Sequence, residues 1–231
     1  MSSTAAKLLY FMGPSGAGKD SLLDWLRQHL PADLPVQWAR RTISRLAAPG
    51  GEAHESTTPD AHAALLAANA FALHWEANGL AYGVRHAELA PLAQGRWLLV
   101  NGSRAYLPEA LQRYPALVAV HITASPDVLR CRLQARGRES AGEVEQRVLR
   151  ALQFEVPPGA ASIEVRNDGT LDDAGQALWQ ALSQLPGWPH AGGTLAPPQP
   201  HPQAASALHS QLPPTPPRPP HSPLHSPLHL P

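Results

Sequence analysis

The chain has 231 residues, 26 of them proline, and its 18 basic and 18 acidic residues leave a formal net charge of zero. This length suits one domain of ordinary size with an appendage, and the neutral balance argues against a nucleic acid or membrane surface held by bulk charge. A single cysteine, Cys131, excludes an internal disulfide. With no signal-peptide pattern and no apolar run near the roughly 20 residues of a membrane helix, we expect a cytoplasmic protein.

The first predicted elements are a strand, a glycine-rich loop and a helix. The apolar run at 8–12 predicts a buried strand, and the apolar spacing at 21–30 predicts a helix. Between them lies a match to G-x-x-x-x-G-K, a loop whose backbone N–H groups and lysine bind nucleotide phosphates. The predicted ATP-binding loop comprises Gly13, Pro14, Ser15, Gly16, Ala17, Gly18, Lys19, Asp20 and Ser21.

Asp20 departs from this motif, because Ser or Thr normally stands there and offers a hydroxyl to magnesium. A carboxylate can take over that task directly or through water, since Mg²⁺ accepts one or two carboxylates and keeps several waters. The neighbouring hydroxyl of Ser21 is the competing ligand. Both residues therefore remain candidates for the magnesium site.

The middle of the chain is predicted to hold short strands and one small helix. Apolar and β-branched runs predict strands at 36–40, 71–75, 96–100 and 117–123. The segment 41–59 is polar, carries Gly and Pro, and is too long for a simple connector. An alanine-rich stretch at 61–70 predicts a helix, and Asn78-Gly79 predicts a turn.

The later elements carry clear end signals. Ser125-Pro126 predicts the start of a helix that Gly137 ends, and Ser140 with Glu143 has the spacing of a capping box for the next helix. A strand at 163–165 and a helix at 171–185 follow. Strands that alternate with helices predict an α/β fold of the P-loop NTPase kind, with a parallel sheet covered by helices on both faces.

The composition changes abruptly beyond Pro186. The segment 186–231 is rich in proline and histidine, contains no acidic residue, and repeats His-Ser-Pro-Leu at 221–228. Such a segment cannot bury enough apolar surface to offset its ordering entropy, so we expect a domain at 1–185 and a disordered tail at 186–231. The histidines of the tail either bind metal weakly or form a solvated segment without a site.

Four arginines surround the Gly137 break: Arg130, Arg132, Arg136 and Arg138. Phosphoryl transfer needs cations on the transferring group, and arginine offers a fixed fork of donors. Arg132 and Arg136 are four residues apart, so they share one helical face. A solvated basic helix face is the alternative, and the preceding phosphate loop favours the functional interpretation.

Taken together, these motifs resemble the guanylate kinase superfamily, and within it the ribose 1,5-bisphosphate phosphokinase family. The resemblance covers about residues 7–185. It is carried by the following segments: the loop with its Asp20, Ala77-Asn78-Gly79-Leu80-Ala81-Tyr82-Gly83-Val84, Val100-Asn101-Gly102-Ser103-Arg104-Ala105, Arg136-Gly137-Arg138-Glu139 and Asn167-Asp168-Gly169.

The resemblance implies a kinase that uses ATP and Mg²⁺ to phosphorylate a small phosphorylated sugar, ribose 1,5-bisphosphate. It implies an acceptor-binding segment at about 36–84 and an arginine lid at about 132–142. The implied catalytic residues are Lys19, Arg132, Arg136 and Arg138, with Asn167 near the adenine. The implied acceptor residues are Arg45, Glu52, Tyr82 and Arg104.

Two departures separate the chain from guanylate kinases. Their second phosphate-binding arginine has no counterpart in 46–49, and Leu73 stands where they carry a guanine-reading glutamate, with Glu76 close by. A guanylate or other nucleoside monophosphate kinase is one alternative, and a non-catalytic nucleotide-binding module is another. The sequence predicts no nucleic-acid or membrane partner and leaves the oligomeric state open.

Overall fold

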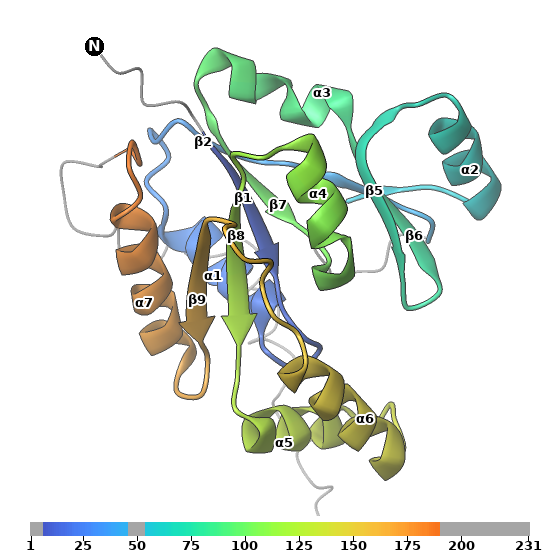
Figure 1. Cartoon of the computed structure of the whole chain (residues 1–231), viewed down its shortest axis with the longest axis vertical. Helices are drawn as coiled ribbons and strands as arrows, with labels where there is room; N and C mark the ends of the chain where they lie inside the picture. Colours follow the sequence, from blue (N-terminus) through green and yellow to red (C-terminus); the bar gives the residue numbers. More distant parts are fainter. Residues whose placement is uncertain (1–6, 46–53, 190–231) are drawn as a thin grey trace, which may run out of the picture. The chain divides into compact units, whose positions relative to one another are not determined.

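The computed structural model describes residues 7–45 and 54–189 (Figure 1). Glu52 and most of the predicted tail, 190–231, lie outside the described residues, so the tail stays a prediction. Within the described residues, no helix is long and apolar enough to cross a membrane.

A five-stranded parallel sheet forms the centre of the described fold. Its strand order is β2-β7-β1-β8-β9, and every pairing between neighbours is parallel. The strands are β2 (Val36–Trp38), β7 (Trp97–Asn101), β1 (Leu8–Met12), β8 (Val118–Thr123) and β9 (Ser162–Arg166). The predicted parallel α/β sheet is confirmed, and the strand ends shift by only one or two residues from the prediction.

Both faces of this sheet are covered, which explains why all of β1 is buried. Leu9 and Phe11 pack into one core with α1 (Lys19–His29) and α7 (Leu171–Ser183). Leu8, Tyr10 and Met12 point the other way, as the two-residue period of a strand requires, into a second core with α4 (Leu107–Arg113). Figure 1 shows α1 and α7 on one side of the sheet and α4 on the other.

A second, four-stranded sheet completes the second core, and the sequence analysis did not predict it as a sheet. Its order is β4-β3-β6-β5, with antiparallel pairing of β3 to β6 and of β6 to β5. The strands are β4 (Glu55–Ser56), β3 (Arg41–Ile43), β6 (Leu80–Arg85) and β5 (Phe71–Ala77). The predicted strand 36–40 was wrong at its end, because the chain leaves the parallel sheet after Trp38 and joins the second sheet at Arg41.

The Asn78-Gly79 turn is confirmed as the tip of the β5–β6 hairpin. Both residues have positive φ, 52° and 72°, which is the backbone of a tight hairpin turn. Tyr82 and Gly83 therefore lie in β6 and not in a loop. The hairpin carries side chains from β5 and β6 to the edge of the site described below.

The remaining helices are α2 (Pro59–Ala67), α3 (His86–Leu89), the 3₁₀ turns η1 (Ala90–Gln94) and η2 (Arg104–Tyr106), α5 (Pro126–Arg136) and α6 (Ala141–Leu152). Among them, α5 and α6 follow the predicted signals closely, α2 begins two residues earlier than predicted, and α3, η1 and η2 were not predicted. The capping box of Ser140 and Glu143 is confirmed at the start of α6. Ser125 precedes α5 as predicted, but its side chain makes no cap bond; its backbone N–H donates to Asp168 Oδ1 at 2.6 Å.

Candidate active site

The carboxyl ends of the parallel strands meet at one edge, and a cleft of about 780 Å³ opens there. One wall is the loop 13–18 with the start of α1. The opposite wall combines β3, the β5–β6 hairpin and the segment Asn101–Ala105. Arg136 of α5 and Arg147 and Arg150 of α6 also line it. This is the same edge to which the sequence assigns phosphate binding.

Two glycines of the loop are required by close backbone approach. A Cβ at Gly13 would lie 2.5 Å from the backbone oxygen of Ile122 in β8. Gly18 has a φ of 81°, and a Cβ there would lie 2.3 Å from Nδ2 of Asn167. The loop therefore sits directly against the ends of β8 and β9, with its N–H groups at the start of α1, where anions are stabilised.

Asn167 connects this loop to the parallel sheet through hydrogen bonds. The side chain is buried, and its Nδ2 donates to the backbone oxygen of Ala17 at 2.8 Å. The backbone N–H of Asn167 donates in turn to Thr123 at the end of β8. Asn167 thus ties the loop to two strand ends, while its predicted contact with adenine stays a prediction.

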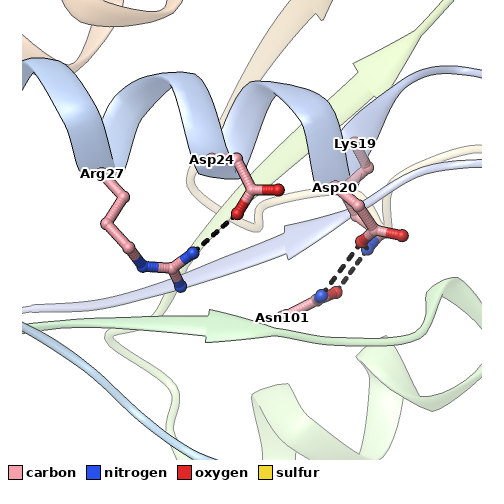
Figure 2. Close-up of polar contacts among 5 residues, drawn as sticks. All are labelled: Lys19, Asp20, Asp24, Arg27 and Asn101. Atoms are coloured by element: carbon pink, nitrogen blue, oxygen red, sulfur yellow. Dashed lines mark hydrogen bonds and ion pairs between the residues drawn. The ribbon is translucent and has the colours of Figure 1, made fainter. Parts of the chain in front are cut away.

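Lys19, Asp20 and Asn101 form a closed set of hydrogen bonds at the start of α1 (Figure 2). The ammonium of Lys19 donates to Oδ1 of Asp20 at 2.5 Å and also to Oδ1 of Asn101. Asn101 Nδ2 donates to the same Asp20 oxygen at 3.1 Å. Asn101, at the end of β7, was not among the predicted site residues, because its role depends on β7 lying beside β1.

The carboxylate of Asp20 is ionised and accessible. The surrounding protein disfavours its charge, but the Lys19 ammonium and hydrogen bonds from Lys19 and Asn101 outweigh this and hold the pKa of Asp20 below its usual value. Its side chain is 74% exposed, and the hydroxyl-bearing Ser21 lines the same wall. One carboxylate with a neighbouring hydroxyl fits a magnesium ion that takes its other ligands from phosphates and water.

The predicted lid arginines take different positions. Arg136 lines the cleft, while Arg132 donates through Nη1 to the backbone oxygen of Gly16 at 3.4 Å from outside it. Arg138 is exposed and is not among the described residues that line the cleft. Arg130 faces away from the loop, in ion pairs with Asp127 at 2.7 Å and Glu145 at 2.5 Å.

Two further lid arginines come from α6 and were not predicted. Arg147 donates through Nη1 to Oγ of Ser15 at 2.9 Å and pairs with Glu139 at 3.1 Å. Arg150 lines the cleft three residues further along the helix. The i,i+3 spacing on a well-capped helix beside the Gly137 break was the available signal, because it places both guanidinium groups on one helix face.

The wall opposite the loop contains three of the four predicted acceptor residues. Tyr82 stacks on Trp75 with ring centroids 5.5 Å apart, and the guanidinium of Arg41 lies 5.2 Å from the Tyr82 ring. Arg45 lines the cleft at the end of the described segment 7–45. Arg104 lines it from η2, whereas Glu52 lies outside the described residues.

Arg104 is held in an unusual environment. Its guanidinium lies 5.2 Å from the ring of Phe154, and its Nη1 is buried without a hydrogen-bond partner in the described part of the chain. Burial, and secondarily the charge of Arg150, lowers the pKa of Arg104 below its usual value. Even so, an arginine stays protonated at neutral pH.

No carboxylate from β5 lines the cleft, where a guanine base would need one as a hydrogen-bond partner. Leu73 is fully buried in the second core, and Trp75 and Ala77 are the β5 residues that line the cleft. Glu76 points to the other face of the strand, where its charge partly opposes the lowering of the pKa of His62 by burial. Because successive side chains of β5 point to opposite faces, Glu76 does not line the cleft.

Comparison with known proteins adds relatives of defined activity. The chain is 46% identical over 177 residues to the ribose 1,5-bisphosphate phosphokinase PhnN of Thiobacillus denitrificans, covering 77% of this chain and 93% of that protein. It is 46% identical over 182 residues to the Burkholderia pseudomallei protein of the same name, covering 79% and 98%. The Pseudomonas paraeruginosa counterpart is also 46% identical, over 172 residues, covering 74% and 92%.

Among solved structures, the chain matches a guanylate kinase from Anaplasma phagocytophilum with a TM-score of 0.55 and 14% sequence identity. The match covers 78% of this chain and 86% of that one, and it supports a shared fold. No family model matches the sequence.

Proposed function

This chain belongs to the ribose 1,5-bisphosphate phosphokinase family, and on that basis we propose that it transfers the γ-phosphoryl group of ATP to α-D-ribose 1,5-bisphosphate. An oxygen of the acceptor's 1-phosphate forms a new bond to the γ-phosphorus as the bond to ADP breaks. The products are ADP and 5-phospho-α-D-ribose 1-diphosphate. The acceptor oxygen is already anionic near neutral pH, so the reaction needs no general base.

One observation carries the proposal beyond the family relationship. The cleft places a phosphate-binding loop opposite a wall whose charged groups are arginines, with Arg41, Arg45 and Arg104 among them. Such a wall suits an acceptor with two phosphate groups, because each phosphate accepts several charge-assisted hydrogen bonds. A nucleobase would instead require paired polar groups for its edge.

On the donor side, the loop amides and Lys19 hold the outer phosphates of ATP. Hydrogen bonds to Asn101 and Asp20 hold the Lys19 ammonium in place at the loop. Little reorganisation is therefore needed when phosphates replace those partners. The closely packed glycines Gly13 and Gly18 keep the backbone N–H groups accessible to phosphate oxygens.

Charge on the transferring group is neutralised mainly by arginine. Arg136 reaches the cleft, and Arg147 reaches the hydroxyl of Ser15 in the loop itself. A well-placed arginine contributes roughly 10³–10⁵ in rate to phosphoryl transfer. Arg132 holds the loop through the Gly16 carbonyl, whereas Arg138 is exposed and does not line the cleft.

Magnesium bound at this site would neutralise part of the charge of the donor phosphates. Asp20 and Ser21 are the residues of this chain placed to hold it. Asp20 keeps its carboxylate ionised because Lys19 and Asn101 both donate to it.

On the acceptor side, Tyr82 and Arg45 are assigned to the reacting phosphate. Stacking on Trp75 fixes the Tyr82 ring and leaves its hydroxyl to a ligand. Ser44 strengthens this wall, since its Oγ accepts a hydrogen bond from the Ala81 N–H at 2.8 Å. Glu52 remains an acceptor candidate outside the described residues.

The decisive experiment incubates the full chain with MgATP and separate acceptors: ribose 1,5-bisphosphate, ribose 5-phosphate, GMP, AMP and UMP. Mass spectrometry should detect 5-phosphoribosyl diphosphate as the dominant product. Faster formation of GDP would overturn the proposal in favour of a guanylate kinase. Absence of ADP with every acceptor would instead favour a non-catalytic nucleotide-binding module.

A further inference from the structure

Several arginines of the described chain form an ion pair with a carboxylate. Arg85 pairs with Glu55 at 2.6 Å, and Arg130 and Arg147 have the acidic partners given above. Arg104 and Arg150 both line the cleft, and neither has an acidic partner among the described residues. Two cations are thus placed near each other with no anion of the described chain between them.

The electrostatic penalty of this arrangement falls mainly on Arg104. Its Nη1 is buried with no acceptor, while Phe154 covers the guanidinium on one side. A buried charged donor without a partner destabilises a protein, and a second cation nearby adds repulsion. An anionic ligand between Arg104 and Arg150 would remove both penalties. Arg150 offers donors for it, since only its Nε is engaged among the described residues, with the Gln146 carbonyl at 3.2 Å.

The place of this pair relative to the phosphate loop indicates which anion it holds. Arg147 and Arg150 are three residues apart on α6, so Arg150 lies just under one helical turn, roughly 4.5 Å along the helix axis, beyond the arginine that contacts Ser15. On the other side of the pair, η2 follows Asn101, the partner of Lys19. The pair therefore lies in the cleft next to the arginine that contacts the phosphate loop.

We propose that Arg104 and Arg150 form a second phosphate subsite, which holds the 5-phosphate of the acceptor and selects bisphosphorylated over monophosphorylated sugars. This subsite rests on the proposed function, in which Tyr82 and Arg45 bind the reacting 1-phosphate. It gives the two phosphates of the acceptor separate arginine partners from different elements. It also assigns a ligand to the unpaired Nη1 of Arg104, which becomes bonded when the anion draws the two arginines together.

The test compares Arg150→Met and Arg104→Met with the wild type. Calorimetry should show D-ribose 5-phosphate, which carries only the non-reacting phosphate, binding about 10–100-fold more weakly to each variant, as expected for a lost hydrogen bond to a charged group. In turnover, kcat/KM for ribose 1,5-bisphosphate should fall by a similar factor. For α-D-ribose 1-phosphate it should change less than about threefold, because that acceptor lacks the 5-phosphate.

Arg96→Met is the matched control, because Arg96 is exposed and does not line the cleft, so its loss removes the same charge elsewhere. An equal loss for both acceptors would overturn the subsite, and so would unchanged ribose 5-phosphate binding in Arg150→Met. Arg150 is exposed at the protein surface, so this variant keeps the test valid if Arg104→Met fails to fold. If the wild type makes no phosphoribosyl diphosphate, the proposed function fails, and ribose 5-phosphate binding still decides the subsite.

Discussion

The two walls of the cleft are built in opposite ways. The donor wall is one continuous segment, 13–21, whose backbone shape is set by glycines packed against β8 and Asn167. The acceptor wall draws side chains from β3, the β5–β6 hairpin, η2 and α6, which are far apart in the sequence. Under the proposed function, ATP recognition is therefore local and uses backbone N–H groups, whereas the acceptor is selected by side chains that only the folded chain brings together.

The two walls also differ in whether their cationic side chains have hydrogen-bond partners within the protein. Lys19 has two partners in place, Asp20 and Asn101, so the donor wall is complete within the protein itself. Arg104 has an unpaired buried donor and a second arginine nearby. The donor wall is thus preorganised, and the acceptor wall is relieved of an electrostatic penalty when an anion binds. The following variants separate these two cases.

The largest effect is expected for Lys19→Ala. Removing the ammonium eliminates the only lysine at the loop, so turnover should fall at least about 10³-fold. Stability should change little, because the lysine lies at the first turn of α1, outside both cores. Single-turnover kinetics and thermal unfolding measure the two quantities. Near-normal turnover would contradict the assignment of this loop to phosphate binding.

Gly13→Ala should damage the donor wall through its backbone. The added Cβ would meet a backbone oxygen at 2.5 Å, so we expect a loss of about 1–3 kcal/mol in the free energy of unfolding and a raised KM for ATP. Gly142→Ala is the matched control, since nothing lies within 4 Å of its added Cβ and its site is helical. In Gly142→Ala, the free energy of unfolding should rise by about 0.5 kcal/mol. Equal effects in denaturant titrations would contradict this difference.

Asp20→Asn and Ser21→Ala separate the two magnesium candidates. If the carboxylate holds the ion, Asp20→Asn should raise the Mg²⁺ concentration for half-maximal turnover by about tenfold, since a first-sphere carboxylate is lost. Ser21→Ala should then shift it less than about twofold. Magnesium titrations at saturating acceptor give both values, and the reverse order would assign the ion to Ser21.

Tyr82→Phe tests the acceptor wall with the smallest change. The ring stays stacked on Trp75, and only the hydroxyl is lost, so the acceptor KM should rise about 2–10-fold, as expected for one hydrogen bond. The KM for ATP should remain the same, because Tyr82 lies on the wall opposite the loop. A rise confined to ATP would show that the two walls have been assigned the wrong ligands.

The sequence by itself determined the parallel sheet, the phosphate loop and the capping box of α6. These features are local: an apolar run followed by Gly13–Lys19, or Ser140 followed three residues later by Glu143, requires nothing from the rest of the chain. For the same reason the hairpin turn at Asn78-Gly79 was predictable, since its two positive φ angles suit those residues.

Only the tertiary structure decided the acceptor wall. Arg41–Ile43 is too short and polar a segment to be identified as a strand until β6 pairs with it, and Glu76 leaves the cleft only because β5 turns Trp75 and Ala77 toward it. Asn101 meets Lys19 because β7 lies beside β1. Arg104 of η2 and Arg150 of α6 are 46 residues apart in the sequence, yet both line the cleft, since packing and not spacing places them there. Contacts between distant segments depend on the whole fold, and no local pattern encodes them.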